Sequence, residues 1–258
     1  MTLTVARQML GAEILKVGRN RGVMAFALLL TSGVVVIYFG YTAIEHASNP
    51  LLNAPAGGIH GFTRGVRSLG EFFGMLAAVL IGAEVGTADL SSGVFRDLVT
   101  TGRSRLALFG VRLPAAAILS LCVSAIAYVL VLIGTFALAG GTATPDLGLI
   151  LQGAGWIAMA NIVVGALAVG VGSLTGSRAL TLTAVIGWQA IVTNLLVNVT
   201  SLGSARDVLL TPALTNLMPV NGGDGSVFMA ATTAVIVVCG WLIISQFAGA
   251  WRTETQDA

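Results

Sequence analysis

Charged side chains are scarce in this sequence. Asp, Glu, Lys and Arg make up 9% of its residues, whereas a soluble domain carries roughly 25%. Hydrophobic residues make up 56% of the chain. Water cannot solvate a surface with so few charges, which excludes a soluble globular protein. The net charge of +2 is small, and we expect no nucleic-acid partner.

Residues that build common catalytic and nucleotide sites are also rare. Lys16 is the only lysine, and Leu15 stands where the phosphate-binding P-loop requires glycine, so this chain cannot bind ATP in the P-loop manner. Its two histidines belong to no H-E-x-x-H zinc motif. Cys122 and Cys239 lie inside apolar runs, which argues against a disulfide framework or a metal pair. We expect no enzymatic activity, and no metal or cofactor, in this chain.

Apolar residues gather in six runs, each long enough for the roughly 20 helical residues that cross a hydrocarbon core. The runs cover about 22–44, 68–87, 106–139, 149–176, 179–199 and 227–250. The first run is too long for the apolar part of a signal peptide, so we expect it to remain in the protein. The expected fold class is an all-α integral membrane protein with six transmembrane helices in a single domain, residues 1–258.

The placement of basic residues predicts the orientation. With the N-terminus inside, ten basic residues fall on the inner side and three on the outer side, which accounts for all thirteen. The outer three are Arg64, Arg67 and Arg206. We therefore expect both termini in the cytoplasm.

Three segments outside the runs have distinct compositions. In 3–21, five apolar residues from Leu3 to Val17 share one arc and the basic residues oppose them, which predicts an interfacial helix beside lipid phosphate. A disordered basic tail is the alternative, because Leu15 breaks the pattern. Residues 45–67 are turn-rich and predict a loop. Residues 200–226 are more apolar but carry prolines, and predict a short re-entrant hairpin on the extracellular side.

Acids within the runs are few. Glu71 lies near the outer end of the second run and Glu84 near its inner end, and no ladder of acids continues through the membrane. An ion-coupled carrier would usually place acids at the midplane. In the fourth run, the spacing Gly172-x-x-x-Gly176 predicts close packing against a neighbouring helix.

Amides and hydroxyls mark the fifth run. Gln189 and Thr193 share one helical face, and Asn194 and Asn198 share another. Two interpretations stay open: these groups bond packed helices together, or they line a substrate path. With Glu71 and Met75, the four residues are the candidate path residues.

The stretch "GAEVGTADLSSGVFRDLVTTGRSR", residues 82–105, places charge between two very apolar runs. A short helix after Asp89 would carry Val94, Leu98 and Val99 as an apolar face between charged residues. This pattern is typical of a docking element, and an ordinary solvated loop is the alternative.

This stretch resembles the motif of ABC exporter permeases of the second type. Members show an acid at the end of span 2, a glycine-hydrophobe unit, an L-L-x-T/S stretch, an S-R pair and a later cation. The matching positions here are Glu84, Gly93-Val94-Phe95, Leu98-Val99-Thr100, Gly102-Arg103-Ser104-Arg105 and Arg112. The sequence departs from the family in having Gly102-Arg103 where proline is common, and Arg112 where lysine is usual.

The resemblance implies a permease subunit in a bacterial plasma membrane, with residues 88–105 as a cytoplasmic coupling helix. A separate ATP-binding cassette subunit would hold ATP and Mg, and a second permease copy would complete the path between spans 2 and 5. The expected contacts with the ATPase are Phe95, Arg96, Asp97, Leu98 and Arg103, and Glu84 and Arg105 would tether the helix. A secondary transporter and a structural subunit of a membrane complex are the alternatives.

Overall fold

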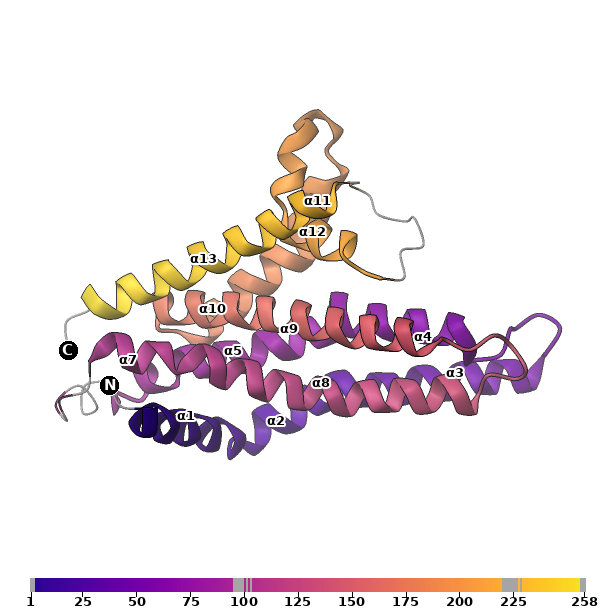
Figure 1. Cartoon of the computed structure of the whole chain (residues 1–258), viewed down its shortest axis with the longest axis horizontal. Coiled ribbons are helices and arrows are strands. Elements are labelled where there is room, and N and C mark those ends of the chain that lie inside the picture. Colours follow the sequence, from indigo (N-terminus) through magenta and orange to yellow (C-terminus); the bar gives the residue numbers. More distant parts are fainter. Residues whose placement is uncertain are drawn as a thin grey trace.

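Figure 1 shows the computed structural model of the chain, which describes residues 3–94, 100, 102, 104–219, 227 and 229–255. All regular structure in these residues is helical. Six helices are long and apolar enough to cross a membrane, so the chain is a multi-pass membrane protein, as expected. Spans 1 to 6 are Arg21–Ser48, Gly58–Ser91, Arg105–Ala137, Leu147–Thr175, Arg178–Asn198 and Ala231–Thr255.

Several spans contain more than one helical segment. Span 1 comprises α2 (Arg21–Leu28), η1 (Leu29–Gly33) and α3 (Val34–Ser48); span 2 comprises α4 (Gly58–Arg67), η2 (Ser68–Phe72) and α5 (Phe73–Ser91). Span 3 comprises α7 (Arg105–Gly110) and α8 (Arg112–Ala137), and span 4 is α9 (Leu147–Thr175). Span 5 comprises α10 (Arg178–Ile186), η3 (Gly187–Val192) and α11 (Thr193–Asn198), and span 6 is α13 (Ala231–Thr255). Outside the spans lie α1 (Leu3–Gly18), the 3₁₀ helix η4 (Thr200–Val208) and α12 (Leu210–Asn216).

The loop predicted over 45–67 is too long at both ends, and α3 already continues to Ser48. Helix α4 begins at Gly58 and runs without a break into span 2, so only 49–57 is irregular. The reason is packing: Phe62, Val66 and Leu69 are fully buried, and their spacing of four and three residues puts them on one helical face. Helix α5 likewise continues to Ser91, past the predicted start of the coupling helix at residue 88.

Glycine sets the distance between spans 2 and 4 at the centre of the molecule. A Cβ atom on Gly82 would overlap the carbonyl oxygen of Gly165, and one on Gly86 would lie 2.8 Å from the carbonyl oxygen of Val169. The two backbones can approach this closely only because the side chains are missing.

Only half of the predicted Gly172-x-x-x-Gly176 motif is a packing motif. Gly172 faces Gly86 as expected, since a Cβ there would lie 3.3 Å from the Gly86 Cα. Gly176 adopts φ 66° and ends α9 as a left-handed cap, with its N–H donating to the Gly172 carbonyl at 2.8 Å. The expectation that Gly176 packs against a neighbour is therefore wrong.

Spans 1, 2 and 5 each contain a π-helical turn, namely η1, η2 and η3. In η3 the extra residue changes the local bonding: the Thr193 hydroxyl donates to the Trp188 carbonyl, five residues back, at 2.9 Å. The Thr87 hydroxyl, in a regular helix, donates four residues back instead. Such turns often occur at functional sites, and η2 and η3 carry Glu71 and Gln189.

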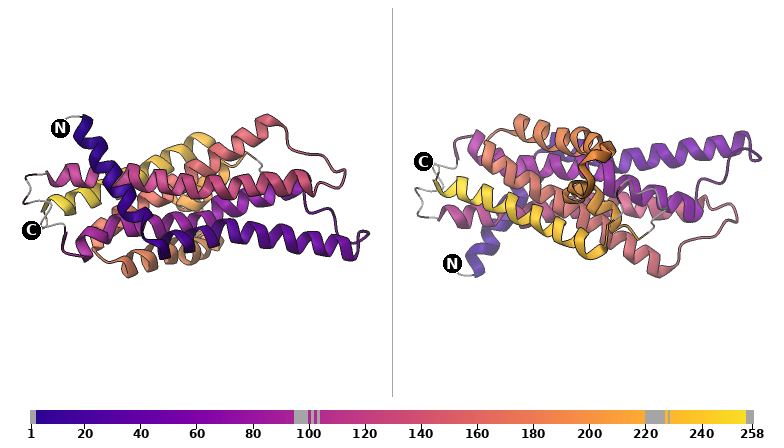
Figure 2. Two further views of the ribbon diagram at one scale, coloured as in Figure 1. Left: turned by 90° about the horizontal axis from the view of Figure 1, so that it is seen from below. Right: turned by 90° about the horizontal axis from the view of Figure 1, so that it is seen from above.

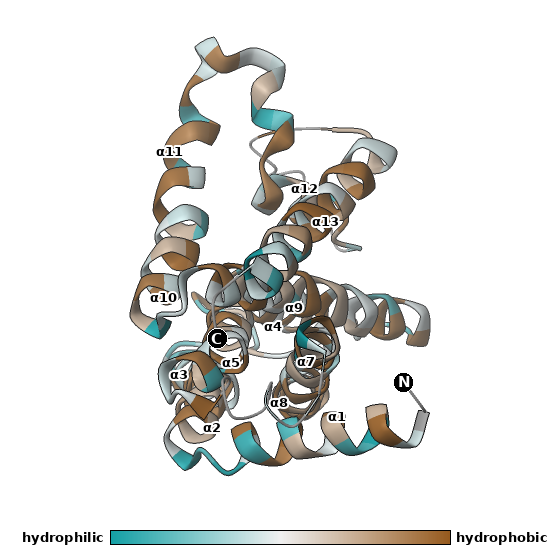
Figure 3. Cartoon of the chain, turned by 90° about the vertical axis from the view of Figure 1, so that its left-hand side faces the viewer, coloured by the Kyte–Doolittle hydropathy of each residue, from teal (hydrophilic) through white to brown (hydrophobic). Residues whose placement is uncertain are grey.

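Spans 1 to 4 form a group that we call the bundle, and spans 5 and 6 with η4 and α12 form the arm. Figure 3 shows α11 rising away from the bundle, whereas α10 packs beside α5 and α9; the outward surface of span 5 is largely hydrophobic. That surface includes Leu180, Ile191 and Leu195, each at least 60% exposed. It suits lipid or another apolar protein surface.

The two ends of the molecule differ. Figure 2 shows α1 lying across the bundle at the same end as the last turn of α13, while the 49–57 loop lies at the opposite end. We call these the terminal end and the distal end. Span 2 ends at Ser91 at the terminal end, so the segment that carries the exporter-like motif leaves the bundle there.

Candidate functional site

Two polar regions stand out among the described residues: a network of charges at the terminal end, and a cavity between the bundle and the arm. The predicted ATPase contacts lie outside the described residues; they are Phe95, Arg96, Asp97, Leu98 and Arg103.

The predicted tether residues have partners other than each other. The Glu84 carboxylate pairs with Arg178 at 2.9 Å and accepts a hydrogen bond from the Asn20 amide at 2.8 Å. Arg105 donates to the backbone carbonyl of Glu254, in the last turn of α13, at 3.0 Å. Arg178 can reach Glu84 because α10 begins two residues after the glycine cap that ends α9. Among the described residues, Glu84 therefore connects span 2 to span 5 and to Asn20.

Asp89 is the centre of what we call the terminal network, which consists of Glu13, Lys16, Asp89 and Arg112. The Lys16 ammonium contacts Glu13 at 2.6 Å and Asp89 at 2.8 Å. The Arg112 guanidinium lies 3.9 Å from the other oxygen of Asp89. Two acids and two bases make the network electrically neutral, which lowers the cost of removing its charges from water.

Arg112 is the most deeply buried charge of this network, at 1% exposed. Besides Asp89, its guanidinium donates to the Ser173 hydroxyl at 2.9 Å. These contacts join α8 to α5 and α9, while Lys16 adds α1. With the Glu84–Arg178 pair, polar contacts at the terminal end connect α1 to spans 2, 3, 4 and 5.

Glu13 lies on α1, outside the spans, and its pKa is raised from its ordinary value. Burial disfavours the charged carboxylate and is the largest cause, and the bond and charge of Lys16 oppose it in part. One carboxylate oxygen, Oε1, is buried and has no hydrogen-bond partner in the described part of the chain. The neutral acid therefore suits this position better than it would suit open water.

Sequence reasoning noted Lys16 and Arg112 but missed their common partner, Asp89. The available signal was the position of Asp89, one and a half helical turns beyond Glu84 at the end of an apolar run. An acid at that depth needs a cation. The three residues lie far apart in the sequence, with a separation of 73 positions from Lys16 to Asp89.

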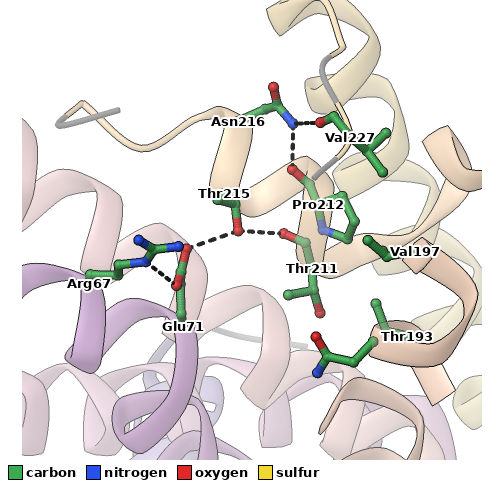
Figure 4. A pocket seen from close by; sticks show the side chains of 10 residues that line it. Arg67, Glu71, Thr193, Val197, Thr211, Pro212, Thr215, Asn216 and Val227 are labelled. Carbon is green, nitrogen blue, oxygen red and sulfur yellow. Dashed lines mark hydrogen bonds and ion pairs between the residues drawn. The ribbon is translucent and has the colours of Figure 1, made fainter. Parts of the chain in front are cut away.

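The second region, which we call the side cavity, lies between span 2, span 5 and α12 (Figure 4). Its volume is about 150 Å³, room for roughly five waters at about 30 Å³ each. Its lining residues are Arg67, Glu71, Thr193, Asn194, Val197, Thr211, Pro212, Thr215, Asn216 and Val227. Most of these side chains are polar, in a protein whose composition is mainly apolar.

The structure brings together part of the predicted path. Glu71, Thr193 and Asn194 line the side cavity. Met75 is buried in the apolar core, and Asn198 is exposed outside the cavity lining, so neither of them is part of this cavity. The two predicted faces of span 5 are confirmed: Gln189 and Thr193 are buried, and Asn194 and Asn198 are exposed.

Helix α12 connects the two π-helical turns across this cavity. The Thr215 hydroxyl donates to Glu71 in η2 at 3.0 Å, and the Thr211 hydroxyl donates to Gln189 in η3 at 3.4 Å. Thr211 and Thr215 are four residues apart and share one helical face. Sequence reasoning missed both, because a threonine in a proline-flanked segment has no pattern that reveals its partner.

The described residues contain no cluster of three or more His, Cys, Asp or Glu side chains that could hold a metal ion. Neither polar region therefore has the composition of a metal centre. No protein-family model matches the chain, and no characterised protein is detectably similar to it in sequence. The family resemblance thus rests on the motif between Glu84 and Arg112 and on the order of the six spans.

Proposed function

We propose that this chain is the membrane-spanning permease subunit of an ATP-driven exporter. It would form the substrate path with a second permease copy and receive its energy from a separate ATP-binding cassette subunit. In this proposal the terminal end faces the cytoplasm, both termini lie inside, and the membrane is a bacterial plasma membrane.

The observation that carries the proposal is the terminal network, together with the Glu84–Arg178 pair. Span 2 ends at Ser91, two residues after Asp89, and Asp89 contacts Lys16 on α1 and Arg112 on span 3. A force applied to the segment that carries the motif would reach several spans at once through these contacts. A solvated loop with no mechanical role would need no such connections.

The arm provides separate support for the same function. In the family, spans 2 and 5 face the substrate path, and here spans 2 and 5 share the polar side cavity. The exposed apolar surface of span 5 offers an area on which a second copy could pack. A purely structural subunit would have no need for a polar cavity between its spans.

The test is a charge reversal in the motif. The full chain is purified with its ATPase from native membranes and reconstituted in vesicles, and ATP hydrolysis is compared with transport. Replacing Arg96→Asp and Asp97→Arg together should weaken the complex about 30-fold or more, since losing a buried charge contact costs at least ~2 kcal/mol, or should leave hydrolysis uncoupled from transport. The matched control is Arg206→Asp with Asp207→Arg, an adjacent Arg–Asp pair in η4, which should change neither.

Two results would contradict the proposal. If the Arg96 and Asp97 reversal leaves the complex and its coupled hydrolysis intact, the segment is only a solvated connector. If the chain alone moves a solute along an ion gradient in vesicles, it is a secondary transporter. Orientation is checked separately: a cysteine at Asn53 should react with an impermeant thiol reagent in whole cells, and one at Ser104 should not.

A further inference from the structure

The side cavity has a definite hydrogen-bonding character, because its hydroxyl hydrogens are already in use. Thr193 donates to the Trp188 carbonyl, Thr211 donates to Gln189, and Thr215 shares its hydrogen between Glu71 and the Thr211 carbonyl. A hydroxyl group has one hydrogen and two lone pairs. All three hydroxyls can therefore offer a ligand an acceptor and not a donor.

The amide of Asn216 has no donor left either. Its Nδ2 donates to the carbonyls of Pro212 at 2.9 Å and Val227 at 2.7 Å, and its Oδ1 accepts from the Met229 N–H at 3.3 Å. Asn216 therefore serves as a structural cross-link that holds the wall of the cavity in place.

Unused acceptors remain on Glu71 and Asn194. Each Glu71 oxygen accepts one bond, from Arg67 or Thr215, and a carboxylate has about four acceptor sites. The Asn194 Nδ2 donates to the Ala190 carbonyl at 2.7 Å, which fixes the orientation of the amide. Its exposed Oδ1 accepts no bond from the described residues. The cavity thus presents more acceptors than donors.

The net charge of the cavity indicates whether a charged or a neutral hydrogen-bond donor fits it better. Among the described residues that line it, only Arg67 and Glu71 are charged, and they pair at 2.8 Å, so the described lining is neutral overall. An ammonium group would approach Glu71 but would also lie close to the Arg67 guanidinium. A neutral group with several hydroxyls can donate to the acceptors without this repulsion, and can accept from Arg67.

A buried amide behind the wall adds an independent observation. Gln189 is 2% exposed, and its Nε2 has no hydrogen-bond partner in the described part of the chain. An unsatisfied buried donor costs about 1–3 kcal/mol. If the amide turned over, Nε2 could donate to Thr211 and release the Thr211 hydrogen toward the cavity. In that orientation the Thr211 hydroxyl, held by Gln189, would supply the one hydroxyl donor that a ligand oxygen could use.

We propose that the side cavity binds a neutral polyhydroxyl group, of the size of a three-carbon polyol, on the molecule that the protein transports. The statement that this molecule is transported rests on the proposed function, but the binding of a polyhydroxyl group does not. The residues that recognise the hydroxyls are Glu71 and Asn194, with the threonine oxygens beside them.

The experiment measures binding alone. The full chain is purified in lipid nanodiscs and titrated with glycerol, and in parallel with ethanolamine, by saturation-transfer NMR. Glycerol should bind saturably in the millimolar range, and ethanolamine should not. The Asn194→Leu and Glu71→Gln variants should each bind glycerol about 3- to 10-fold more weakly, the effect of losing one hydrogen bond.

Asn198→Leu is the matched control. Asn198 is exposed and donates to the carbonyl four residues back at 2.7 Å, as Asn194 does, but it does not line the cavity. The proposal is overturned if Asn198→Leu weakens binding as much as Asn194→Leu, if ethanolamine binds in place of glycerol, or if glycerol binding never saturates. None of these results depends on an ATPase. The proposed exporter function can therefore be contradicted while the binding site is confirmed, and the binding site can be contradicted while the function is confirmed.

Discussion

The bundle and the arm are built from similar residues but are held together differently. The buried share of the most apolar stretch is 72% in spans 2 and 4 at the centre of the bundle, 28% and 44% in its outer spans 1 and 3, and 28% and 22% in spans 5 and 6 of the arm. The bundle packs backbone against backbone at Gly82 and Gly86, and it closes its terminal end with ion pairs. The arm has one glycine contact with the bundle, where Gly170 meets Ser245 and Gly249, and the Glu84–Arg178 pair at the terminal end; elsewhere it relies on single hydrogen bonds, such as those of Thr211 and Thr215. In a membrane, where apolar side chains gain little from leaving lipid, glycine contacts and charge pairs decide which spans are rigid.

The largest expected effect on stability comes from replacing one arginine in the bundle, with one arginine in the arm replaced for comparison. Arg112→Met should destabilise the protein by about 3–5 kcal/mol, because the substitution leaves Asp89 partly unpaired in a buried site. Arg178→Gln should cost no more than about 1 kcal/mol, because the Arg178 side chain is 40% exposed. Unfolding of the full chain in mild detergent, followed by tryptophan fluorescence, measures both. Equal losses would mean that burial does not separate the two regions.

A second pair of variants tests the glycines. Gly82→Ala should cost about 1–3 kcal/mol, because its Cβ would overlap the Gly165 carbonyl and force spans 2 and 4 apart. Gly240→Ala in α13 should stabilise the protein by about 0.5–1 kcal/mol, because a Cβ there meets nothing within 4 Å and alanine favours the helix. The same unfolding measurement applies. A destabilising Gly240→Ala would show that the arm is packed as tightly as the bundle.

Two tryptophans, one in the bundle and one in the arm, each donate a hydrogen bond to a backbone carbonyl of the arm. Trp156, on α9, donates to the Leu214 carbonyl at 2.8 Å in a buried position, and Trp241, on α13, donates to the Val208 carbonyl at 2.9 Å in an exposed one. Trp156→Phe should cost about 1–2 kcal/mol, since a buried carbonyl loses its partner. Trp241→Phe should cost less than about 0.5 kcal/mol, since solvent or a lipid headgroup can replace the bond. A larger loss for Trp241→Phe would contradict the contrast.

The smallest effect concerns pH and involves α1, which lies across the bundle at its terminal end. The pKa of Glu13 is raised in the folded state above its ordinary value of 4.5. Between the ordinary pKa and the folded-state pKa, the folded protein therefore binds more protons than the unfolded chain. The contribution of Glu13 to stability is therefore fully present below pH 4.5 and is lost as the pH rises through its folded-state pKa. The Glu13→Gln variant should lack this slope when unfolding is measured from about pH 4 to pH 8. An unchanged slope in the variant would assign the pH dependence to other groups.

The spans could be predicted from the sequence because apolar length is visible in it. The predicted runs 106–139 and 179–199 agree closely with Arg105–Ala137 and Arg178–Asn198. Helix α4 was missed because Gly57-Gly58 and the polar residues after it are typical of a loop. The apolar residues Phe62 and Val66 carried a helical spacing that the turn signals obscured.

The two polar regions were harder to predict, for a different reason. Glu71, Thr193 and Asn194 could be singled out, because polar groups are unusual in a span. Their gathering around one cavity depends on α12, whose position follows from tertiary packing against α9 and α13. Asp89 and Lys16 meet only because α1 turns back across the bundle (Figure 2).

The π-helical turns η1, η2 and η3 have a consequence for comparing this chain with its relatives. Each such turn holds one surplus residue, which bulges outward while the helix on either side keeps its direction. Deleting that residue would restore an ordinary α-helix and leave both flanks facing their present neighbours. Homologues are therefore free to differ by a single-residue gap within 29–33, 68–72 or 187–192, in the middle of a span. Alignments that forbid gaps inside membrane helices would place every residue beyond such a gap one position out of register.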